Sequence, residues 1–254
     1  MKERIRVSAV SYLNTAPFVY GLQHTSIRDL IDLTLDYPAE CARKVITGES
    51  EMGLIPVAAI PSIPSYKLVT DYCIGAVGPV RTVVLFSNTP IESVERIYLD
   101  YQSRTSVILI KVLCKSYWNI NPEWTPFTPI HTYKDIDPYE GLVIIGDKVF
   151  ENEPYFKYKY DLAETWIKFT GLPFVFAAWA TSKQLDQSFI NAFNSSLGYG
   201  IESIPASIEF ISNSKISKPE AEHYLRNNIS FNFNQPKHEA LKLFWSLAQE
   251  FQPG

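Results

Sequence analysis

Hydroxyl and amide side chains follow apolar runs of the chain at several points. The group nearest the N-terminus comes directly after the apolar segment 5–10 and consists of Ser11, Tyr12, Asn14 and Thr15. An amide offers both a donor and an acceptor, and each hydroxyl can do the same, so the group suits a polar ligand. The pattern is equally typical of a capped turn without a ligand, with Ser11 and Thr15 as the capping residues.

A second group, SRTS, lies at residues 103–106 and precedes a long apolar segment. Ser103 is a favourable N-cap, and the following backbone N–H groups of a helix lack intrahelical partners. The helix dipole places partial positive charge at the same point, so the site suits an anion. Thr105 and Ser106 add hydroxyls, and Arg104 can bind a carboxylate with two hydrogen bonds. An ordinary helix cap with a solvent-facing arginine remains the alternative.

Two further polar positions follow apolar or glycine-containing segments. Asp147 follows the apolar run 141–145 after a single glycine, Gly146, and either caps a turn or contacts a ligand. Arg81 and Thr82 follow Gly78 in the stretch GPVRT, where both a structural and a ligand-binding role are open.

Several classes of function are disfavoured by what the sequence lacks. The net charge of −4 with no cluster of lysines and arginines argues against nucleic-acid binding. The four histidines share no metal-ligand spacing, and no phosphate-binding or nucleophile motif occurs. We therefore expect no metal, no cofactor and no membrane partner. The three widely spaced cysteines and the absence of a signal-peptide pattern predict a cytoplasmic protein.

Strand and helix patterns alternate along most of the 254-residue chain. We expect strands at 5–10, 30–37, 51–57, 96–101, 141–147 and 171–182, and two extended runs within 67–88. We expect helices at 38–48, 103–118, 184–204, 219–229 and 236–251. This alternation predicts an α/β fold with mainly parallel pairing, in which ligands bind at the carboxyl ends of strands. The polar groups above occur at such strand ends, which suits a small carboxylate.

Six segments also occur in the order found in chorismate dehydratases, which open the futalosine route of menaquinone biosynthesis. They are SYLNTAPF, EMGLIPVA, YCIGAVGPVRTVVLFS, LDYQSRTS, VIIGDKVF and YDLAETWIKFTGLPFVFAAW. The chain resembles that family over about residues 5–182. The resemblance implies a two-lobed fold like the type II periplasmic binding proteins, with a central cleft. It implies one lobe of residues 1–86 plus 179–254, including the C-terminal helices, and a second lobe of residues 87–178.

The activity that the resemblance implies is removal of water from chorismate, a dicarboxylate, to give 3-[(1-carboxyvinyl)oxy]benzoate. The ring loses a C–H proton and the neighbouring hydroxyl and becomes aromatic. Asn14 resembles the family's catalytic polar residue, and Thr82 is the second expected catalytic residue. Because an amide is a poor base, a water or a substrate carboxylate is left as the proton acceptor. The expected substrate-binding residues are Ser11, Tyr12, Thr15, Ser103, Arg104, Thr105, Ser106 and Asp147.

The chain departs from the family pattern at two positions. Thr82 stands where the family usually has serine, so the hydroxyl is kept but gains a methyl group. Arg81 stands where a small or apolar residue is usual, and either contacts a carboxylate or points to solvent. Arg104 either binds the substrate or braces its loop, for example through Asp147.

Three other functions are open for the same sequence. The first is a small-carboxylate-binding protein of the same fold without catalysis. The second is the later enzyme of the same route, which cleaves a cyclic futalosine derivative, but its family has Pro-Asn-Asp where this chain has Leu-Asn-Thr. The third is a structural or interaction module, which the polar groups at the strand ends disfavour. The sequence leaves monomer and dimer equally open.

Overall fold

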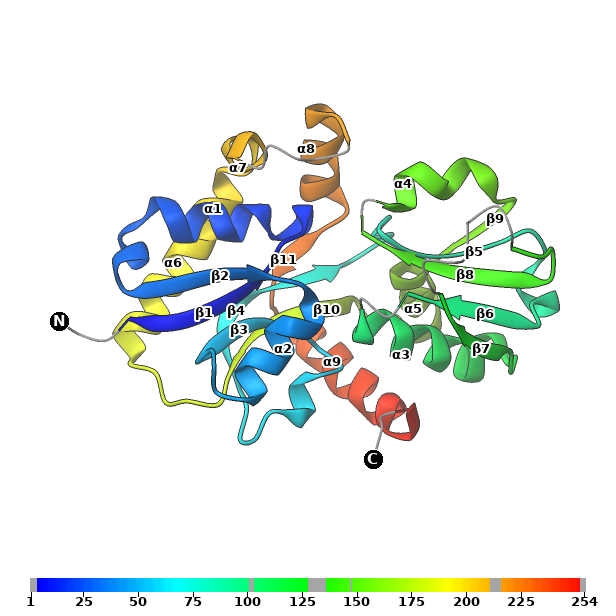
Figure 1. Ribbon diagram of the computed structural model, residues 1–254, viewed down its shortest axis with the longest axis horizontal. Coiled ribbons are helices and arrows are strands. Elements are labelled where there is room, and N and C mark those ends of the chain that lie inside the picture. Colours follow the sequence, from blue (N-terminus) through cyan, green and yellow to red (C-terminus); the bar gives the residue numbers. More distant parts are fainter. Residues whose placement is uncertain (1–3, 101–102, 128–135, 147, 211–215, 252–254) are drawn as a thin grey trace. The chain divides into compact units, whose positions relative to one another are not determined.

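A computed structural model of the chain describes residues 4–100, 103–127, 136–146, 148–210 and 216–251. The chain divides into two compact units, which comprise residues 1–75 with 175–235 and residues 76–174 with 236–254. Each unit is built on one mixed sheet flanked by helices (Figure 1). The α/β class is therefore confirmed.

The first unit holds a six-stranded sheet with the order β11-β4-β10-β3-β1-β2. Its strands are β1 Ile5–Val10, β2 Ile31–Asp36, β3 Met52–Pro56, β4 Lys67–Ala76, β10 Phe174–Thr181 and β11 Ser230–Asn232. β1 is parallel to both β2 and β3, whereas β10 is antiparallel to β3 and β11 is antiparallel to β4. The expectation of mainly parallel pairing was wrong, because strands that return late in the chain join this sheet in the opposite direction.

Helices cover both faces of this sheet because its central strands are apolar on both sides, as in β3. They are α1 Ala16–His24, α2 Pro38–Ile46, α6 Gln187–Glu202, α7 Ile204–Phe210 and α8 Lys218–Asn227. Figure 1 shows α1, α6 and α7 on one side and α2 on the other. α1 and α6 cross closely, since a Cβ atom at Gly21 would lie 1.9 Å from the Ser196 carbonyl oxygen.

The second unit holds a five-stranded sheet with the order β7-β6-β8-β5-β9. Its strands are β5 Val83–Ser87, β6 Arg96–Leu99, β7 Glu123–Pro126, β8 Glu140–Ile145 and β9 Tyr158–Asp161. Its helices are α3 Arg104–Leu113, α4 Lys148–Asn152, α5 Leu162–Thr170 and α9 Gln235–Ala248, and a π-helical turn at Cys114–Trp118 continues α3. β6 is parallel to β7 and β8, whereas β5 is antiparallel to β8 and β9.

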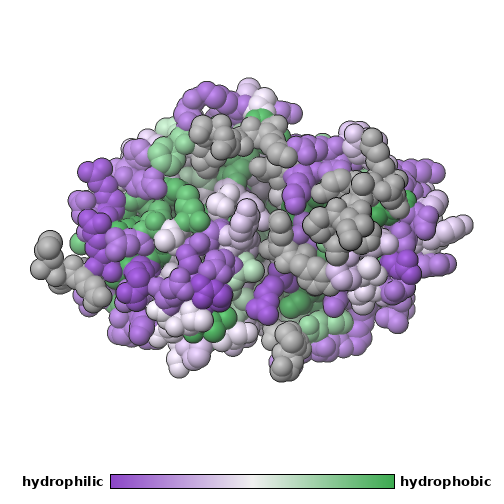
Figure 2. Space-filling view, viewed as in Figure 1, coloured by the Kyte–Doolittle hydropathy of each residue, from purple (hydrophilic) through white to green (hydrophobic). Residues whose placement is uncertain are grey.

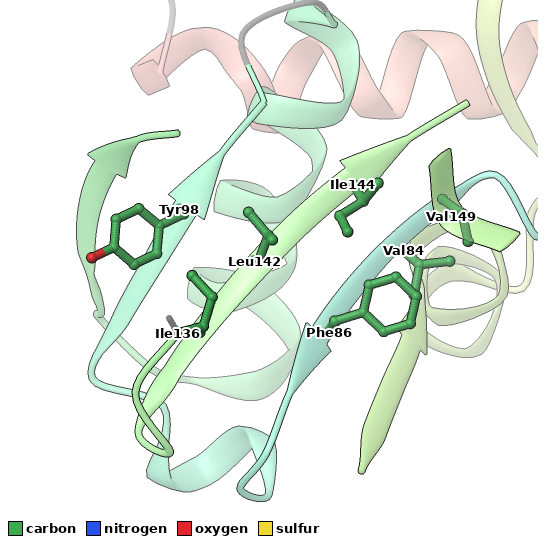
Figure 3. Close-up of a cluster of buried hydrophobic side chains, with 7 residues drawn as sticks. All are labelled: Val84, Phe86, Tyr98, Ile136, Leu142, Ile144 and Val149. Atoms are coloured by element: carbon green, nitrogen blue, oxygen red, sulfur yellow. The ribbon is translucent and has the colours of Figure 1, made fainter. Parts of the chain in front are cut away.

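One face of the second sheet carries a compact apolar cluster (Figure 3). Its buried members are Val84, Phe86, Tyr98, Ile136, Leu142, Ile144 and Val149. Val149 belongs to α4, so this short helix covers the same face. Alternate residues of β5 and β8 supply the cluster, as the two-residue repeat of a strand requires.

Short 3-10 helices complete the elements at Leu13–Thr15, Ser26–Asp29, Ile60–Ser62, Ile91–Ser93, Glu153–Tyr155 and Gln249–Phe251. Hydrophilic residues cover most of the visible surface in Figure 2. Some hydrophobic residues also reach the surface, and among the described residues Leu35 of β2 is 48% exposed.

The last helix groups with the second unit. Phe244 of α9 lies with its ring centroid 5.2 Å from that of Phe174 and 6.1 Å from that of Trp166 of α5. The compact units place residues 76–86 and this helix with the second sheet. The expected lobes, 1–86 plus 179–254 and 87–178, place both with the first sheet and stay a prediction. The aromatic contacts account for its position, which the amphipathic pattern of α9 alone does not specify.

Candidate functional site

The polar group after β1 lies at the carboxyl end of two parallel strands. Val10 of β1 pairs with Asp36 of β2, and the Ser11 backbone N–H donates to the Asp36 carbonyl at 3.1 Å. A 3-10 turn over Leu13–Thr15 then leads into α1. We refer to Ser11, Tyr12, Asn14 and Thr15 as the first edge.

The capping role expected for Ser11 and Thr15 was wrong. Tyr12 occupies the N-cap of the 3-10 turn, and Thr15 the N-cap of α1, and neither side chain accepts a capping hydrogen bond. The reason is local: the 3-10 turn runs directly into α1, so Thr15 already has helical backbone angles. Its buried hydroxyl donates instead to the Asn14 side-chain oxygen at 3.2 Å. Ser11 is exposed.

Asn14 is half-buried, and of the two polar atoms of its side-chain amide only the oxygen has a hydrogen-bond partner among the described residues. The Thr15 hydroxyl occupies the side-chain oxygen, while the side-chain nitrogen has no hydrogen-bond partner among the described residues. Because Thr15 fixes the amide orientation, the nitrogen is left as a directed donor.

The first edge is anchored to Asp36, whose carboxylate lies in a network of hydrogen bonds that the sequence analysis did not predict. The Asp36 carboxylate accepts hydrogen bonds from Ser8 at 2.7 Å, Thr34 at 2.8 Å and the Lys44 ammonium at 2.8 Å. Burial pushes the pKa of the Asp36 carboxyl upward, but the bonds from Lys44, Ser8 and Thr34 outweigh it and hold that pKa below its usual value. The same residue's carbonyl anchors Ser11.

Three segments meet at one edge of the second sheet. β6 and β8 are parallel, so both end there, and β5 is antiparallel to β8, so it begins there. The sequence analysis had predicted that the residues after β6 and those after β8 lie at the carboxyl ends of strands. We refer to Thr82, Ser103, Arg104, Thr105, Ser106 and Gly146 as the second edge.

Ser103 caps α3 as predicted. Its hydroxyl accepts from the Ser106 backbone N–H at 3.2 Å and lies 2.8 Å from the Ser106 hydroxyl. Thr105 and Ser106 are each only 1% exposed, so their side chains face the interior of the unit. The hydroxyls of Ser103 and Ser106 therefore hold the turn at the start of α3, and anion binding by its backbone N–H groups stays a prediction.

Arg104 is exposed and forms no ion pair with any described residue. Its backbone N–H likewise has no partner among the described part of the chain. Asp147, the expected brace and substrate ligand, lies outside the described residues. An ion pair that the sequence did not predict joins Lys148 to Asp100 at 4.0 Å and links the start of α4 to the residue after β6.

Thr82 is 3% exposed, and both its hydroxyl, which donates to the Val80 carbonyl at 3.5 Å, and its backbone are engaged. Its carbonyl accepts a hydrogen bond from the Gly146 N–H at 2.8 Å, and Gly146 has a positive φ of 68°. This bond ties the start of β5 to the end of β8. The extra methyl group of threonine is therefore buried at the second edge.

The sequence analysis also did not identify Asp161, the last residue of β9, as a candidate functional residue. It lines a pocket of about 210 Å³ together with Arg81, Glu153, Lys159 and other residues of the second unit. Burial raises the pKa of the Asp161 carboxyl, and bonds from backbone N–H groups oppose this rise. Arg81 is exposed, and its guanidinium lies 5.2 Å from the ring centroid of Phe150.

Within the described ranges, no group of three His, Cys, Asp or Glu residues could hold a metal ion. His24, for example, stacks on Tyr20 with ring centroids 4.0 Å apart. None of the helices in the described part of the chain combines the length and apolar character needed to cross a bilayer.

Comparison with solved structures supports the periplasmic-binding-protein fold. The chain is similar to a protein from Archaeoglobus fulgidus, with a TM-score of 0.76, 17% identity and coverage of 98% and 97% of the two chains. It is also similar to a Candida albicans protein described as having the generic periplasmic binding protein fold, with a TM-score of 0.65, 14% identity and coverage of 98% and 94%. The alkanesulfonate-binding protein of Xanthomonas axonopodis gives a TM-score of 0.62 at 13% identity, with coverage of 98% and 92%.

Sequence comparison gives the family. A chorismate dehydratase from Thermus thermophilus is 26% identical over 196 residues, which is 68% of each protein. The model of a family described as menaquinone biosynthesis matches residues 5–250, and it thus includes both edges and all but the ends of the chain. The chain belongs to this menaquinone biosynthesis family, as its sequence motifs had predicted.

Proposed function

We propose that the chain is a chorismate dehydratase, a carbon–oxygen lyase that converts chorismate to 3-[(1-carboxyvinyl)oxy]benzoate in menaquinone biosynthesis. The observation that carries this proposal is the 26% identity to the Thermus thermophilus chorismate dehydratase within the menaquinone biosynthesis family. In the reaction a ring C–H bond and the neighbouring C–O bond break, a ring double bond forms, and one water leaves. Aromatisation of the ring supplies the driving force.

The second edge suits one carboxylate of the substrate. The start of α3 offers a backbone N–H at Arg104, the positive end of the helix dipole and the exposed Arg104 side chain. Ser103 and Ser106 hold this turn through their mutual hydrogen bonds. Thr105 and Asp147 belong to the proposed binding residues as well, and Thr82 supplies a hydroxyl to the reacting part of the substrate.

The first edge suits the departing hydroxyl. The Asn14 side-chain nitrogen is a directed donor, and a hydrogen bond to the leaving oxygen stabilises the negative charge that develops there. Ser11, Tyr12 and Thr15 complete the proposed substrate contacts of this edge. A water or a carboxylate of the substrate takes the proton, because an amide does not act as a base at neutral pH.

The variant Asn14→Ala tests the proposed role of the amide. We expect kcat to fall by about 10²-fold or more, as for loss of a donor to a developing oxyanion, with little change in the dissociation constant of chorismate. Asn14→Asp is a second variant that separates loss of the donor from loss of side-chain volume. It keeps the size of the side chain and the acceptor for Thr15 but lacks the N–H donor, so its kcat should be as low as that of Asn14→Ala. Near-normal turnover in either variant would remove Asn14 from the mechanism.

A small-carboxylate-binding protein without catalysis is the second candidate. Thr82, in place of the serine usual in the family, is the residue that favours it, because its buried methyl group alters the surroundings of the hydroxyl. Chorismate that binds with normal affinity but is returned unchanged would support this candidate.

A cytoplasmic location is part of the proposal. It is supported by the three cysteines, which are free and buried thiols, as expected of a reducing compartment.

A further inference from the structure

Asp161 connects two segments that are far apart in the sequence. One carboxylate oxygen accepts hydrogen bonds from the backbone N–H groups of Ala163 and Glu164, both at 3.0 Å, and so caps α5. The other oxygen accepts from the Arg81 backbone N–H at 2.7 Å, across a separation of 80 residues. The backbone at Val80 also acts to lower the pKa of this carboxyl. A single side chain therefore fixes both the start of α5 and the turn before β5.

The turn that Asp161 holds has an unfavourable backbone conformation. Arg81 has a φ of 64°, in the left-handed region that residues with a Cβ atom adopt only at a cost. Such a conformation persists only when surrounding interactions enforce it. The charge-assisted hydrogen bond that the Asp161 carboxylate accepts from the Arg81 N–H is shorter than the two that it accepts at the start of α5, and it acts directly on the strained residue.

The conformation of Arg81 determines where Thr82 lies. Thr82 follows the strained residue directly, and its carbonyl binds Gly146 at the second edge. Release of the turn at Val80 and Arg81 would change the direction in which the chain enters β5 and thereby move the Thr82 hydroxyl. Misplacement of a reacting group by about 1 Å can lower a rate by about 10²-fold.

We propose that Asp161 is a positioning residue for Thr82 in the dehydration of chorismate, which acts by holding Arg81 in its left-handed conformation. This inference rests on the proposed function. It assigns no contact with the substrate to Asp161. Its effect on the reaction passes entirely through the turn of residues 80–82.

The variant Asp161→Asn separates the two roles of the carboxylate. The remaining side-chain oxygen can still cap α5, because asparagine is as good an N-cap as aspartate. The amide nitrogen then faces the Arg81 N–H, and two donors cannot bond. Asp161→Ser is a second variant, because serine also caps a helix but is too short to reach Arg81. Both variants are thus expected to fold.

Two readouts are measured on each variant. Hydrogen exchange followed by mass spectrometry should be faster in a peptide of residues 78–84 and unchanged in a peptide of residues 161–167. Turnover of chorismate should show a kcat lower by about tenfold to a hundredfold, with a chorismate dissociation constant within about threefold of the parent value. Ser217→Ala, which removes the cap of α8 in the other unit, is the matched control and should leave both readouts unchanged.

A rescue variant tests whether Asp161 affects turnover through the backbone conformation of Arg81. Glycine adopts positive φ freely, so Arg81→Gly should restore most of the turnover when it is combined with Asp161→Asn. Faster exchange at 78–84 with normal kcat would overturn the proposal, as would unchanged exchange there in both Asp161 variants. If the parent protein binds chorismate but does not convert it, the proposed function fails, whereas the exchange data still report whether Asp161 holds the turn.

Discussion

Replacement of Ser103 separates the folding role of the second edge from its proposed role in binding. The Ser103 hydroxyl accepts the Ser106 backbone N–H and also contacts the Ser106 hydroxyl, which is almost completely buried. Ser103→Ala removes both interactions at once. It leaves one end of α3 uncapped and one buried hydroxyl without its partner.

The magnitude follows from these two losses. Removal of an N-cap costs about 1 kcal/mol, and an unsatisfied buried hydroxyl costs about 1 kcal/mol or more. A total of about 2 kcal/mol should lower Tm by roughly 4–8 °C in a protein of this size. Thermal unfolding followed by circular dichroism measures the shift. An unchanged Tm would refute the account of the α3 cap.

Ser103→Asp is the companion variant. Aspartate caps a helix as well as serine does and interacts favourably with the helix dipole, so the stability should equal or exceed that of the parent. Its charge would repel a carboxylate bound at the start of α3 by about 1 kcal/mol or more, which weakens chorismate binding by at least about fivefold. Isothermal titration calorimetry measures this affinity. Parental affinity in Ser103→Asp would contradict the assignment of the α3 N-terminus to a substrate carboxylate.

Three further predictions concern packing, charge and the reacting hydroxyl. Gly21→Ala should lower the free energy of unfolding by about 3 kcal/mol or more, because the new Cβ would lie 1.9 Å from the Ser196 carbonyl oxygen. Lys44→Met should cost about 1–2 kcal/mol at pH 7. That cost should shrink as the pH falls below about 4, since the folded-state pKa of Asp36 is lowered and its stabilisation is lost on protonation. Thr82→Ser should cost about 1 kcal/mol of stability through loss of a buried methyl group, while turnover of chorismate persists because the hydroxyl remains.

Matched controls accompany these three variants. Gly78→Ala should be mild, because a Cβ there meets nothing within 4 Å. Lys168→Met breaks an exposed ion pair with Glu164 and should have little effect at any pH. Thr82→Val keeps the shape of the side chain but lacks the hydroxyl, so it should lose turnover. Denaturant unfolding at pH 7 and pH 3.5 and a chorismate assay test these expectations, and the reasoning fails if a control matches its partner variant.

Local sequence signals predicted elements whose ends are set by nearby residues. The strand 5–10 was predicted residue for residue, and Pro38 and Gly48 correctly bracketed α2. Ser103 was correctly predicted to cap α3. In each case the information lies within a few residues of the element, where propensity and capping act.

Features that depend on distant segments escaped the sequence analysis. The bond from Arg81 to Asp161 spans 80 residues, and the bond from Ser8 to Asp36 spans 28. No local pattern marks such pairs, so the network under the first edge and the carboxylate that holds the turn before β5 were both missed. The direction of β10 beside β3 was missed for the same reason.

The central claim is that the chain removes water from chorismate, and a single-turnover reaction tests it most directly. Purified protein in excess over chorismate is quenched after a series of times, and the products are separated by liquid chromatography with mass detection. The account predicts conversion of all the chorismate to an aromatic product that is lighter by one water. Recovery of unchanged chorismate, under conditions in which calorimetry shows it bound, would contradict the claim.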